Sequence, residues 1–254
     1  MARQHEIIPP HEITRMMEPT LARLRDLFVD RPQGFFVDVG ANDPHEGSWT
    51  WHLEQRGWKG ILVEPLPQRY EELRENRPNS RVFQVACGSP GQRGEAVLHI
   101  GKDDRFSSLA DPINNPAAVF ERSVSVPVRT LDDILEECGN PAVDLLCLDT
   151  EGTELDVLNG CDIERHRPRV IVIEDTVHDL LLRKHRWLKA HGYRLVYRTT
   201  HDGWYVPRDY RALDIPTVRD RLEFLRKYYL GTPLRWAKLW RHRRRLRRSQ
   251  RRTT

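Results

Sequence analysis

Residues 35–44 read FFVDVGANDP, a mostly apolar run that leads into a glycine and several polar residues. The run Phe35–Val39 is typical of a strand that is buried on both faces of a sheet. Gly40 permits a tight turn and a close approach of a ligand to the backbone. A strand, a glycine turn and a helix in this order are typical of the cofactor loop of α/β proteins. We therefore expect a nucleotide-type cofactor to bind where this strand ends.

The segments that follow alternate between strand and helix patterns. Strands are expected at Ile61–Val63, Val82–Val85, Leu145–Leu148, Val170–Ile173, Arg194–Tyr197 and Trp204–Val206. Helices are expected at Ser48–Arg56, Pro67–Asn76, Thr153–Leu158 and His178–Ala190. Such alternation predicts an α/β fold with a mostly parallel sheet that is covered on both faces. The last two strands are joined by a short turn that contains Gly203, so we expect a hairpin and an antiparallel last strand.

The regions outside this alternation predict three further features. Glu95–Ile100 and Ser123–Val128 are expected to form an extra antiparallel pair, with a polar loop between them. Leucines at the start of the chain fall at helical spacing and predict a helical lead-in. We therefore divide the chain into a helical N-terminal extension (1–31), a catalytic domain (32–210) and a helical, basic C-terminal extension (211–254).

The composition excludes several classes of protein. Hydrophobic residues make up 39% of the 254 residues, which is enough to bury a core. No apolar stretch approaches the ~20 residues of a membrane-spanning helix, and the first ten residues lack the apolar core of a signal peptide. The four cysteines form no C-x-x-C pair, which favours reduced thiols. We expect a cytoplasmic protein.

Residues 235–252 hold ten lysines and arginines and no acid. The whole chain has a net charge of +4, so subtracting this +10 leaves −6 for the remainder. Trp236, Leu239 and Trp240 lie at helical spacing in this basic tail. A helix of this kind can bind nucleic acid or lie on an anionic membrane. The alternative is that the tryptophans pack on the domain while the arginines are solvated.

The acids of the first loop distinguish between cofactors. Asp38, Asp43 and Glu46 crowd the glycine turn and the start of the helix. They would repel the pyrophosphate of a dinucleotide such as NAD. S-adenosylmethionine has no phosphate, and it carries an ammonium group and a cationic sulfur. The loop therefore favours S-adenosylmethionine, the alternative being that these acids only cap the helix.

A second acid follows the glycine turn at the sequence spacing that is typical of a ribose-binding acid. Glu64 ends the strand ILV and follows Gly40 by 64 − 40 = 24 residues, close to the ~20 expected for the acid that accepts hydrogen bonds from ribose hydroxyls. A carboxylate has two acceptor oxygens for two neighbouring hydroxyls. Pro65 then directs the chain away from the sheet. We therefore assign Glu64 and Pro65 to the cofactor site.

More acids follow the two later buried strands. Asp149 and Glu151 come after Leu148, and Glu174-Asp175 ends the next strand. Three interpretations stay open. The acids act as a general base and substrate clamp, they hold a cation such as Mg²⁺, or Glu151 and Asp175 cap helices. His201, in the hairpin turn, is a further candidate catalytic residue, with a plain surface histidine as the alternative.

Five blocks, taken together, resemble the FkbM-type methyltransferases. They are FFVDVGANDP (35–44), the segment GSWTWHLEQRGWKGILVEPLPQRYEELRENRP (47–78), VPVRTLDDIL (126–135), VDLLCLDTEGTELDVLNG (143–160) and RPRVIVIE (167–174). The resemblance implies a Rossmann-like class I methyltransferase fold with seven strands and a reversed last strand. It also implies methyl transfer from S-adenosylmethionine, typically to a hydroxyl of a small molecule, polyketide or sugar.

The matched blocks also imply roles for individual residues. Asp38, Gly40, Ala41 and Asn42 fall on the cofactor loop, and Glu64 falls on the ribose acid. Asp149, Glu151 and Gly152 form the D-x-E-G block. With Ser48, Pro65 and Ala86 added, these residues are the expected cofactor-binding set, and Asp149, Glu151 and His201 are the expected catalytic set. We assign no metal ligand, and Mg²⁺ stays a less favoured alternative.

We expect an S-adenosylmethionine-dependent O-methyltransferase that acts on a small-molecule or glycan acceptor. Two other functions stay open. A non-catalytic binding module would keep the fold and use the basic tail on nucleic acid or an anionic membrane. An NAD-dependent oxidoreductase would need a loop that tolerates a pyrophosphate. The variable segment Gly101–Arg122 and the hairpin turn are expected to shape the acceptor pocket.

Overall fold

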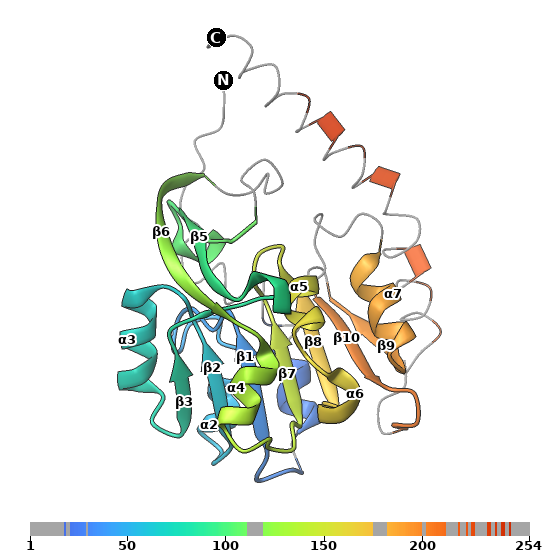
Figure 1. The fold of residues 1–254 in the computed structure, drawn as a ribbon. Helices are drawn as coiled ribbons and strands as arrows, with labels where there is room; N and C mark the ends of the chain where they lie inside the picture. Colours follow the sequence, from blue (N-terminus) through green and yellow to red (C-terminus); the bar gives the residue numbers. More distant parts are fainter. Residues whose placement is uncertain are drawn as a thin grey trace.

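The computed structural model describes residues 21–28, 30–110, 119–174, 182–199 and 202–211, with single positions elsewhere. Figure 1 shows a central sheet with helices packed on it and a smaller sheet beside its upper edge. Most of the basic tail, and with it Trp236 and Leu239, lies outside the described residues, as do Asp175, His178 and His201. Within the described part of the chain, no helix has the length and apolar character needed to cross a membrane.

The central sheet has seven strands in the order β3-β2-β1-β7-β8-β10-β9. These are β3 (Ser80–Phe83), β2 (Lys59–Val63), β1 (Phe35–Val39), β7 (Leu145–Leu148), β8 (Val170–Glu174), β10 (Asp202–Pro207) and β9 (Tyr193–Arg198). The pairs from β3 to β8 are parallel, whereas β10 is antiparallel to both of its neighbours. The expected Rossmann-like class I methyltransferase fold is confirmed, with the reversed last strand placed between β8 and β9.

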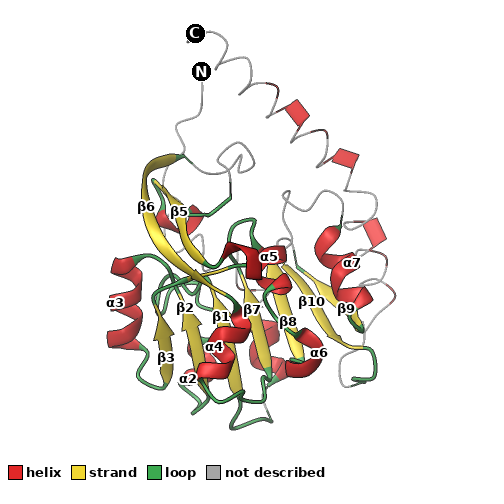
Figure 2. Cartoon of the chain, viewed as in Figure 1, coloured by secondary structure: helices red, strands yellow, loops and turns green. Residues whose placement is uncertain are grey.

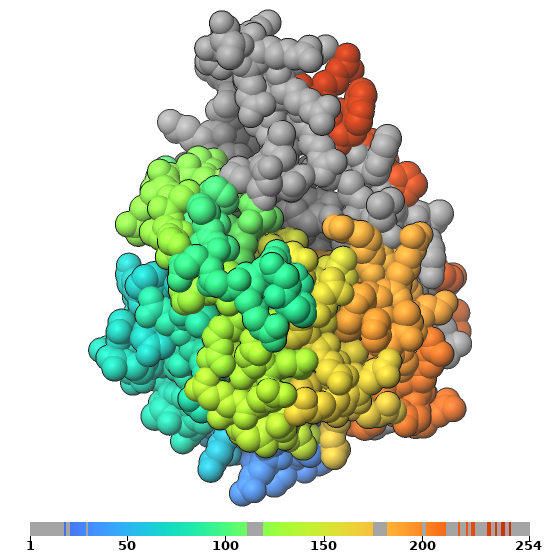
Figure 3. Space-filling view, viewed as in Figure 1, coloured from blue at the N-terminus to red at the C-terminus, as the bar shows by residue number. Residues whose placement is uncertain are grey.

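Alternate residues of the strands pack into two cores. Val37 and Val39 of β1 face a core shared with α4 (Leu131–Glu137), α5 (Glu154–Asn159), α6 (Ile163–His166) and α7 (Arg183–Ala190). Phe36 faces the opposite core, which is shared with α2 (Trp51–Glu54), α3 (Pro67–Asn76) and the helix at residues 21–27. Figure 2 shows the helices against the strands. In Figure 3 the green and yellow segments, which include α4, α5 and α6, cover the face of the sheet that forms the first core.

The lead-in helix contributes directly to the second core. Leu24 and Phe28 are buried, and the Phe28 ring centroid lies 4.7 Å from that of Trp58. The expected spacing of apolar residues in this helix is confirmed by that packing. Helix α4 was not expected from its pattern, although Thr130 and Asp133 form a capping box at its start. The capping box was the local signal that could have predicted this helix.

A second sheet lies between β3 and α4 in the chain. It has the order β4-β6-β5, with β4 (Ala86–Cys87), β5 (Gly94–Gly101) and β6 (Phe120–Arg129). The expected antiparallel pair is confirmed in β5 and β6. The short helices η1 (Pro90–Gln92) and η2 (Asp104–Phe106) flank β5. Leu98 and Ile100 pack with Leu66, so this sheet stands over the end of β2.

Candidate active site

The site lies where β1, β2, β7 and β8 end, because parallel strands present their carboxyl ends at one edge of a sheet. Gly40 leaves β1 with a φ of 86°, a left-handed conformation that favours glycine. A Cβ at this position would lie 1.9 Å from the carbonyl oxygen of Asp149. The ends of β1 and β7 therefore touch through backbone atoms, and only glycine fits between them.

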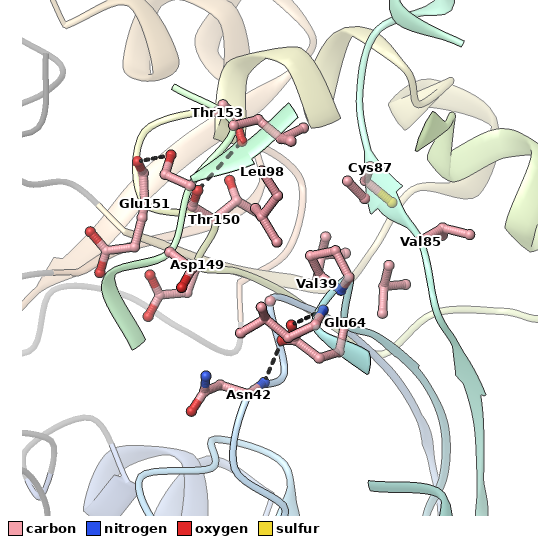
Figure 4. Close-up of a pocket in the computed structure, with 18 of the residues that line it drawn as sticks. Val39, Asn42, Glu64, Val85, Cys87, Leu98, Asp149, Thr150, Glu151 and Thr153 are labelled. Atoms are coloured by element: carbon pink, nitrogen blue, oxygen red, sulfur yellow. Dashed lines mark hydrogen bonds between the residues drawn. The ribbon is translucent and has the colours of Figure 1, made fainter. Parts of the chain in front are cut away.

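A cavity of about 530 Å³, part of it open to solvent, lies at this edge. Seven of the expected site residues line it: Gly40, Asn42, Glu64, Pro65, Ala86, Asp149 and Glu151. Figure 4 shows Asn42 and Glu64 together at one end of the cavity and Asp149 and Glu151 at the other. Apolar walls come from Val39, Val63, Leu66, Val85 and Leu98. The cavity thus combines an apolar wall with polar groups at two ends, as small-molecule sites do.

Glu64 is fixed by the backbone of the loops around it. The Asn42 N–H donates to Oε2 at 2.9 Å and the Leu66 N–H donates to Oε1 at 2.8 Å. Burial raises the pKa of Glu64 to about 7, although these two donors lower it. Asn42 Oδ1 is buried and has no hydrogen-bond partner among the described residues. An acid and an amide oxygen are therefore available to accept hydrogen bonds from a ligand with hydroxyl or amino groups.

Three other expected residues lie outside the lining of the cavity. Asp38 is buried and accepts a hydrogen bond from the Thr50 hydroxyl at 2.8 Å. Ser48 accepts one from Arg77 Nη1 at 3.1 Å, and Ala41 packs in the second core. Burial raises the pKa of Asp38 to about 6. These contacts connect the loop to α2, and the assignment of the three residues to the cofactor stays a prediction.

Three carboxylates gather at the other end of the cavity. Asp149, Glu151 and Glu174 each offer an oxygen within 4.8 Å of the other two. Burial, followed by the charges of neighbouring acids, raises the pKa of Asp149 to about 8 and holds those of Glu151 and Glu174 well above their usual range. The expected convergence of acids from two strands is therefore observed for these three residues, while Asp175 and His201 lie outside the described residues.

The loop between β7 and α5 is organised by Glu154, a residue that the sequence analysis did not single out. Its Oε1 accepts from the Gly152 N–H at 2.8 Å and from the Thr150 N–H at 3.2 Å. Its Oε2 accepts from the Lys184 ammonium at 3.1 Å. Burial opposes ionisation, but Lys184 and the backbone donors outweigh it and lower the pKa of Glu154 to about 2.

The capping interpretation of Glu151 is therefore wrong, because Glu154 makes the side-chain contacts that hold this loop. The backbone of Glu151 takes a φ of 55°, and its carbonyl accepts from the Ser108 hydroxyl at 2.8 Å. This conformation leaves the carboxylate of Glu151 at the acidic cluster. The position of Glu154, three residues after Glu151 and in the first turn of the expected helix, was a signal in the sequence for this role. An acid in the first turn of a helix favours contacts with free N–H groups.

The second sheet supplies the remaining polar wall. Asp104, Arg105, Ser107 and Ser108 line the cavity, within the segment expected to shape the acceptor pocket. Arg69 of α3 ties this wall to the main domain, because its Nε donates to Asp104 Oδ2 at 2.8 Å. Arg105 Nε donates to Asp103 Oδ1 at 2.7 Å. In total, four acids and one arginine line the cavity.

The known proteins that this chain resembles are methyltransferases. Residues 38–195 match the model of the methyltransferase FkbM domain, which is more than half of the chain. The 2-O-methyltransferase NoeI of Sinorhizobium fredii is 26% identical over an alignment 166 residues long, which covers 60% of this chain and 67% of NoeI. Methyltransferase 1 of Beauveria bassiana is 27% identical over an alignment 170 residues long, which covers 55% of this chain and 66% of that protein. The chain thus spans about two thirds of these curated relatives.

Among solved structures, the FkbM methyltransferase of Methylobacillus flagellatus is 19% identical with a TM-score of 0.44, over 69% of this chain and 44% of that one. The METTL16 methyltransferase domain is 11% identical with a TM-score of 0.44, over 80% of this chain and 68% of that one. The family match covers β2, β7 and the last two residues of β1, and residues at the ends of these three strands line the cavity. By that match, the chain belongs to the FkbM methyltransferase family.

Proposed function

We propose that the protein transfers a methyl group from S-adenosylmethionine to a hydroxyl of a small-molecule or glycan acceptor. The observation that carries this proposal is an acidic cavity at the carboxyl edge of the sheet, with Glu64 at the end of β2 and a glycine turn at the end of β1. Membership of the FkbM methyltransferase family supports it. The name of the relative NoeI, a 2-O-methyltransferase, supports oxygen as the acceptor atom.

The residues fit the cofactor in chemistry as well as in position. Glu64 is placed to accept hydrogen bonds from two ribose hydroxyls, and the unpartnered Asn42 Oδ1 can accept another. Gly40 lines the cavity with its backbone, directly after the end of β1. The acids that line the cavity favour a cationic ligand over one with a pyrophosphate. When bound, S-adenosylmethionine supplies a methyl group on a reactive sulfonium.

The protein's remaining task is to orient the acceptor and accept its proton. Asp149 lines the cavity, and its raised pKa of about 8 suits a general base near neutral pH. Ser107 also lines the cavity and adds a polar hydroxyl to its wall. The apolar wall beside these groups lowers the local dielectric constant and so strengthens their electrostatic interactions. Alignment then supplies much of the rate enhancement.

A parallel binding experiment separates this function from its two rivals. Thermal denaturation is measured with S-adenosylhomocysteine, with NAD and with RNA. We expect S-adenosylhomocysteine alone to raise the melting temperature, because it binds the folded state only. A shift with NAD would indicate an oxidoreductase. A shift with RNA and none with S-adenosylhomocysteine would indicate a binding module that uses the basic tail.

Glu64→Ala is expected to weaken the binding of S-adenosylhomocysteine by about 1–3 kcal/mol, or roughly 5- to 150-fold. The variant removes a charge-assisted acceptor from the ribose site, while the Asn42 and Leu66 N–H groups lose their partner. Isothermal calorimetry measures the change. Glu75→Ala, on the exposed side of α3, is the control and should bind as the parent protein does. Unchanged affinity in a folded Glu64→Ala protein would remove Glu64 from the site.

The same residue should make cofactor binding depend on pH. Burial raises the pKa of Glu64 to about 7 in the free protein, the nearby Asp104 raises it further, and Arg69 opposes this. A ligand that needs the carboxylate must displace a proton below that pH. Affinity should therefore fall as the pH decreases from 8 to 6. Glu64→Gln keeps the shape without the titration, so calorimetry on this variant should give a flatter pH profile.

A further inference from the structure

We infer that the carboxylates of Asp149, Glu151 and Glu174 form a binding site for a divalent cation with oxygen ligands. One oxygen of each residue lies within 4.8 Å of the other two. Glu174 ends β8, whereas Asp149 and Glu151 follow β7, the strand beside it. The three ligands thus come from two adjacent strand ends, which the parallel ladder of β7 and β8 holds in register. A site of this kind needs no movement of the sheet to close around an ion.

The second observation concerns Glu174 alone. The residue is only 6% exposed, and its Oε2 is buried with no hydrogen-bond partner among the described residues. A buried carboxylate oxygen without a partner is strongly unfavourable, so such groups are usually paired or bound to a metal. The Lys184 ammonium donates to the backbone carbonyl oxygen of Glu174, so this hydrogen bond satisfies the backbone of the residue and not its carboxylate. The carboxylate of Glu174 is therefore the group in the cluster that most needs a cation.

The electrostatics of the cluster agree with the geometry. Burial and the neighbouring acids raise the pKa values of Glu151 and Glu174 well above the usual range. Lys184 opposes this effect, but its ammonium also binds Glu154 Oε2 at 3.1 Å. Three acids that repel one another take up either protons or a cation. A divalent ion would neutralise two of the three charges at once.

The ligand set indicates the class of ion. Carboxylate oxygens suit hard cations such as Mg²⁺, Mn²⁺ and Ca²⁺. The limit of 4.8 Å equals twice a Ca²⁺–O distance of about 2.4 Å, and it exceeds twice a Mg²⁺–O distance of about 2.1 Å by only a little. Small side-chain adjustments would therefore close the site on the smaller ions. Water and an acceptor oxygen would complete the coordination.

The ion's role rests on the proposed function. Asp149 and Glu151 line the cavity as well as the cluster, so a bound cation would face the space left for the acceptor. There it could bind the acceptor hydroxyl and lower the pKa of that group. The competing occupant is the ammonium of the cofactor, which the same acids could hold. The two occupants can be told apart by removing one carboxylate. If the cluster binds a cation, the variant loses metal affinity; if it binds the ammonium, the variant loses cofactor affinity and no metal binds.

The test uses Mn²⁺ as the probe and the full chain. Titration is followed by electron paramagnetic resonance, which detects free Mn²⁺ directly. We expect one saturable site with a Kd at or below about 1 mM, from which Mg²⁺ displaces Mn²⁺. Glu174→Gln and Glu151→Gln should each weaken Mn²⁺ binding by about tenfold or more, since affinity follows the number of charged ligands. Glu164→Gln, an exposed acid of α6, is the matched control and should leave binding unchanged.

Calorimetry with S-adenosylhomocysteine on the same proteins keeps the two proposals apart. Mn²⁺ binding that the cluster variants weaken supports the cation site, even if no cofactor binds and the proposed function fails. Absence of saturable Mn²⁺ binding overturns the site, even if the cofactor binds normally. Equal Mn²⁺ binding by the parent protein and by a folded Glu151→Gln protein also overturns it. Loss of cofactor affinity in Glu174→Gln without any Mn²⁺ binding overturns it in favour of the ammonium.

Discussion

Asp149→Asn is expected to lower the rate of methyl transfer by about 100-fold or more, the usual scale for a positioned acid or base. The substitution keeps the shape of the side chain and removes its charge. Asp149 lines the cavity directly after β7, and its N–H is held by the Val39 carbonyl at 3.0 Å, so its backbone should stay in place. The rate is measured with methyl-labelled cofactor and an acceptor found by screening metabolites.

The control for this prediction is Asp156→Asn. It is the same chemical change, but Asp156 belongs to α5 and does not line the cavity. Cofactor affinity should change far less than the rate if Asp149 acts on the acceptor. Addition of EDTA separates a direct base, which it leaves active, from a cation-assisted reaction, which Mg²⁺ should restore. A normal turnover rate in the variant would contradict a catalytic role. So would simple unfolding, which would make Asp149 a structural residue.

Gly40→Ala is expected to destabilise the fold by about 2–4 kcal/mol and to lower the melting temperature by roughly 5–15 °C. Two effects add. Alanine disfavours the φ of 86°, and its Cβ would lie 1.9 Å from the Asp149 carbonyl oxygen. Neither strand end can move freely, because the Gly40 N–H donates to the Val63 carbonyl at 2.9 Å. Thermal denaturation with and without S-adenosylhomocysteine measures the loss of stability and of cofactor binding.

Gly139→Ala separates the two effects. Gly139 has a φ of 78°, and no atom lies within 4 Å of the position that its Cβ would occupy. This control should therefore lose only the conformational contribution, about 1 kcal/mol, and should bind cofactor normally. If Gly40→Ala and Gly139→Ala lose the same stability, then the contact between the ends of β1 and β7 is looser than the structure indicates.

The elements that the sequence predicted best are those whose own residues decide their structure. β1 and β7 lie at Phe35–Val39 and Leu145–Leu148, as expected, because a continuous apolar run between polar residues has one stable place in such a fold. α3 spans Pro67–Asn76 as expected, with proline in its first turn. α2 is shorter than expected at Trp51–Glu54: Ser48 lies ahead of the helix, where its hydroxyl oxygen accepts hydrogen bonds from the Thr50 and Trp51 N–H groups.

The candidate site, too, has residues that the sequence predicted and roles that it did not. The spacing from Gly40 predicted Glu64, and the structure places both residues on one cavity. The acids after β7 and β8 were predicted to converge, but their individual roles were not. Glu151 and Glu154 are both acids near the start of α5. Only the left-handed backbone conformation at Glu151 decides that Glu154 is the one that accepts hydrogen bonds from the N–H groups of this loop. Such a choice depends on Lys184 and Ser108, which come from distant parts of the chain.

By itself, the sequence determined the class of fold, the approximate places of the strands of the central sheet and the acids at their ends, because apolar runs, turns and strand-end residues are local properties of the chain. The strand expected at Val82–Val85 lies two residues earlier, at Ser80–Phe83. Only the tertiary structure decided which acids lie close enough to interact electrostatically. The distance among Asp149, Glu151 and Glu174, the unpartnered Oε2 of Glu174 and the pairing of Glu154 with Lys184 all depend on contacts between separate elements. Electrostatic energy depends on distance and burial in space, and neither is written in the spacing of residues along a chain.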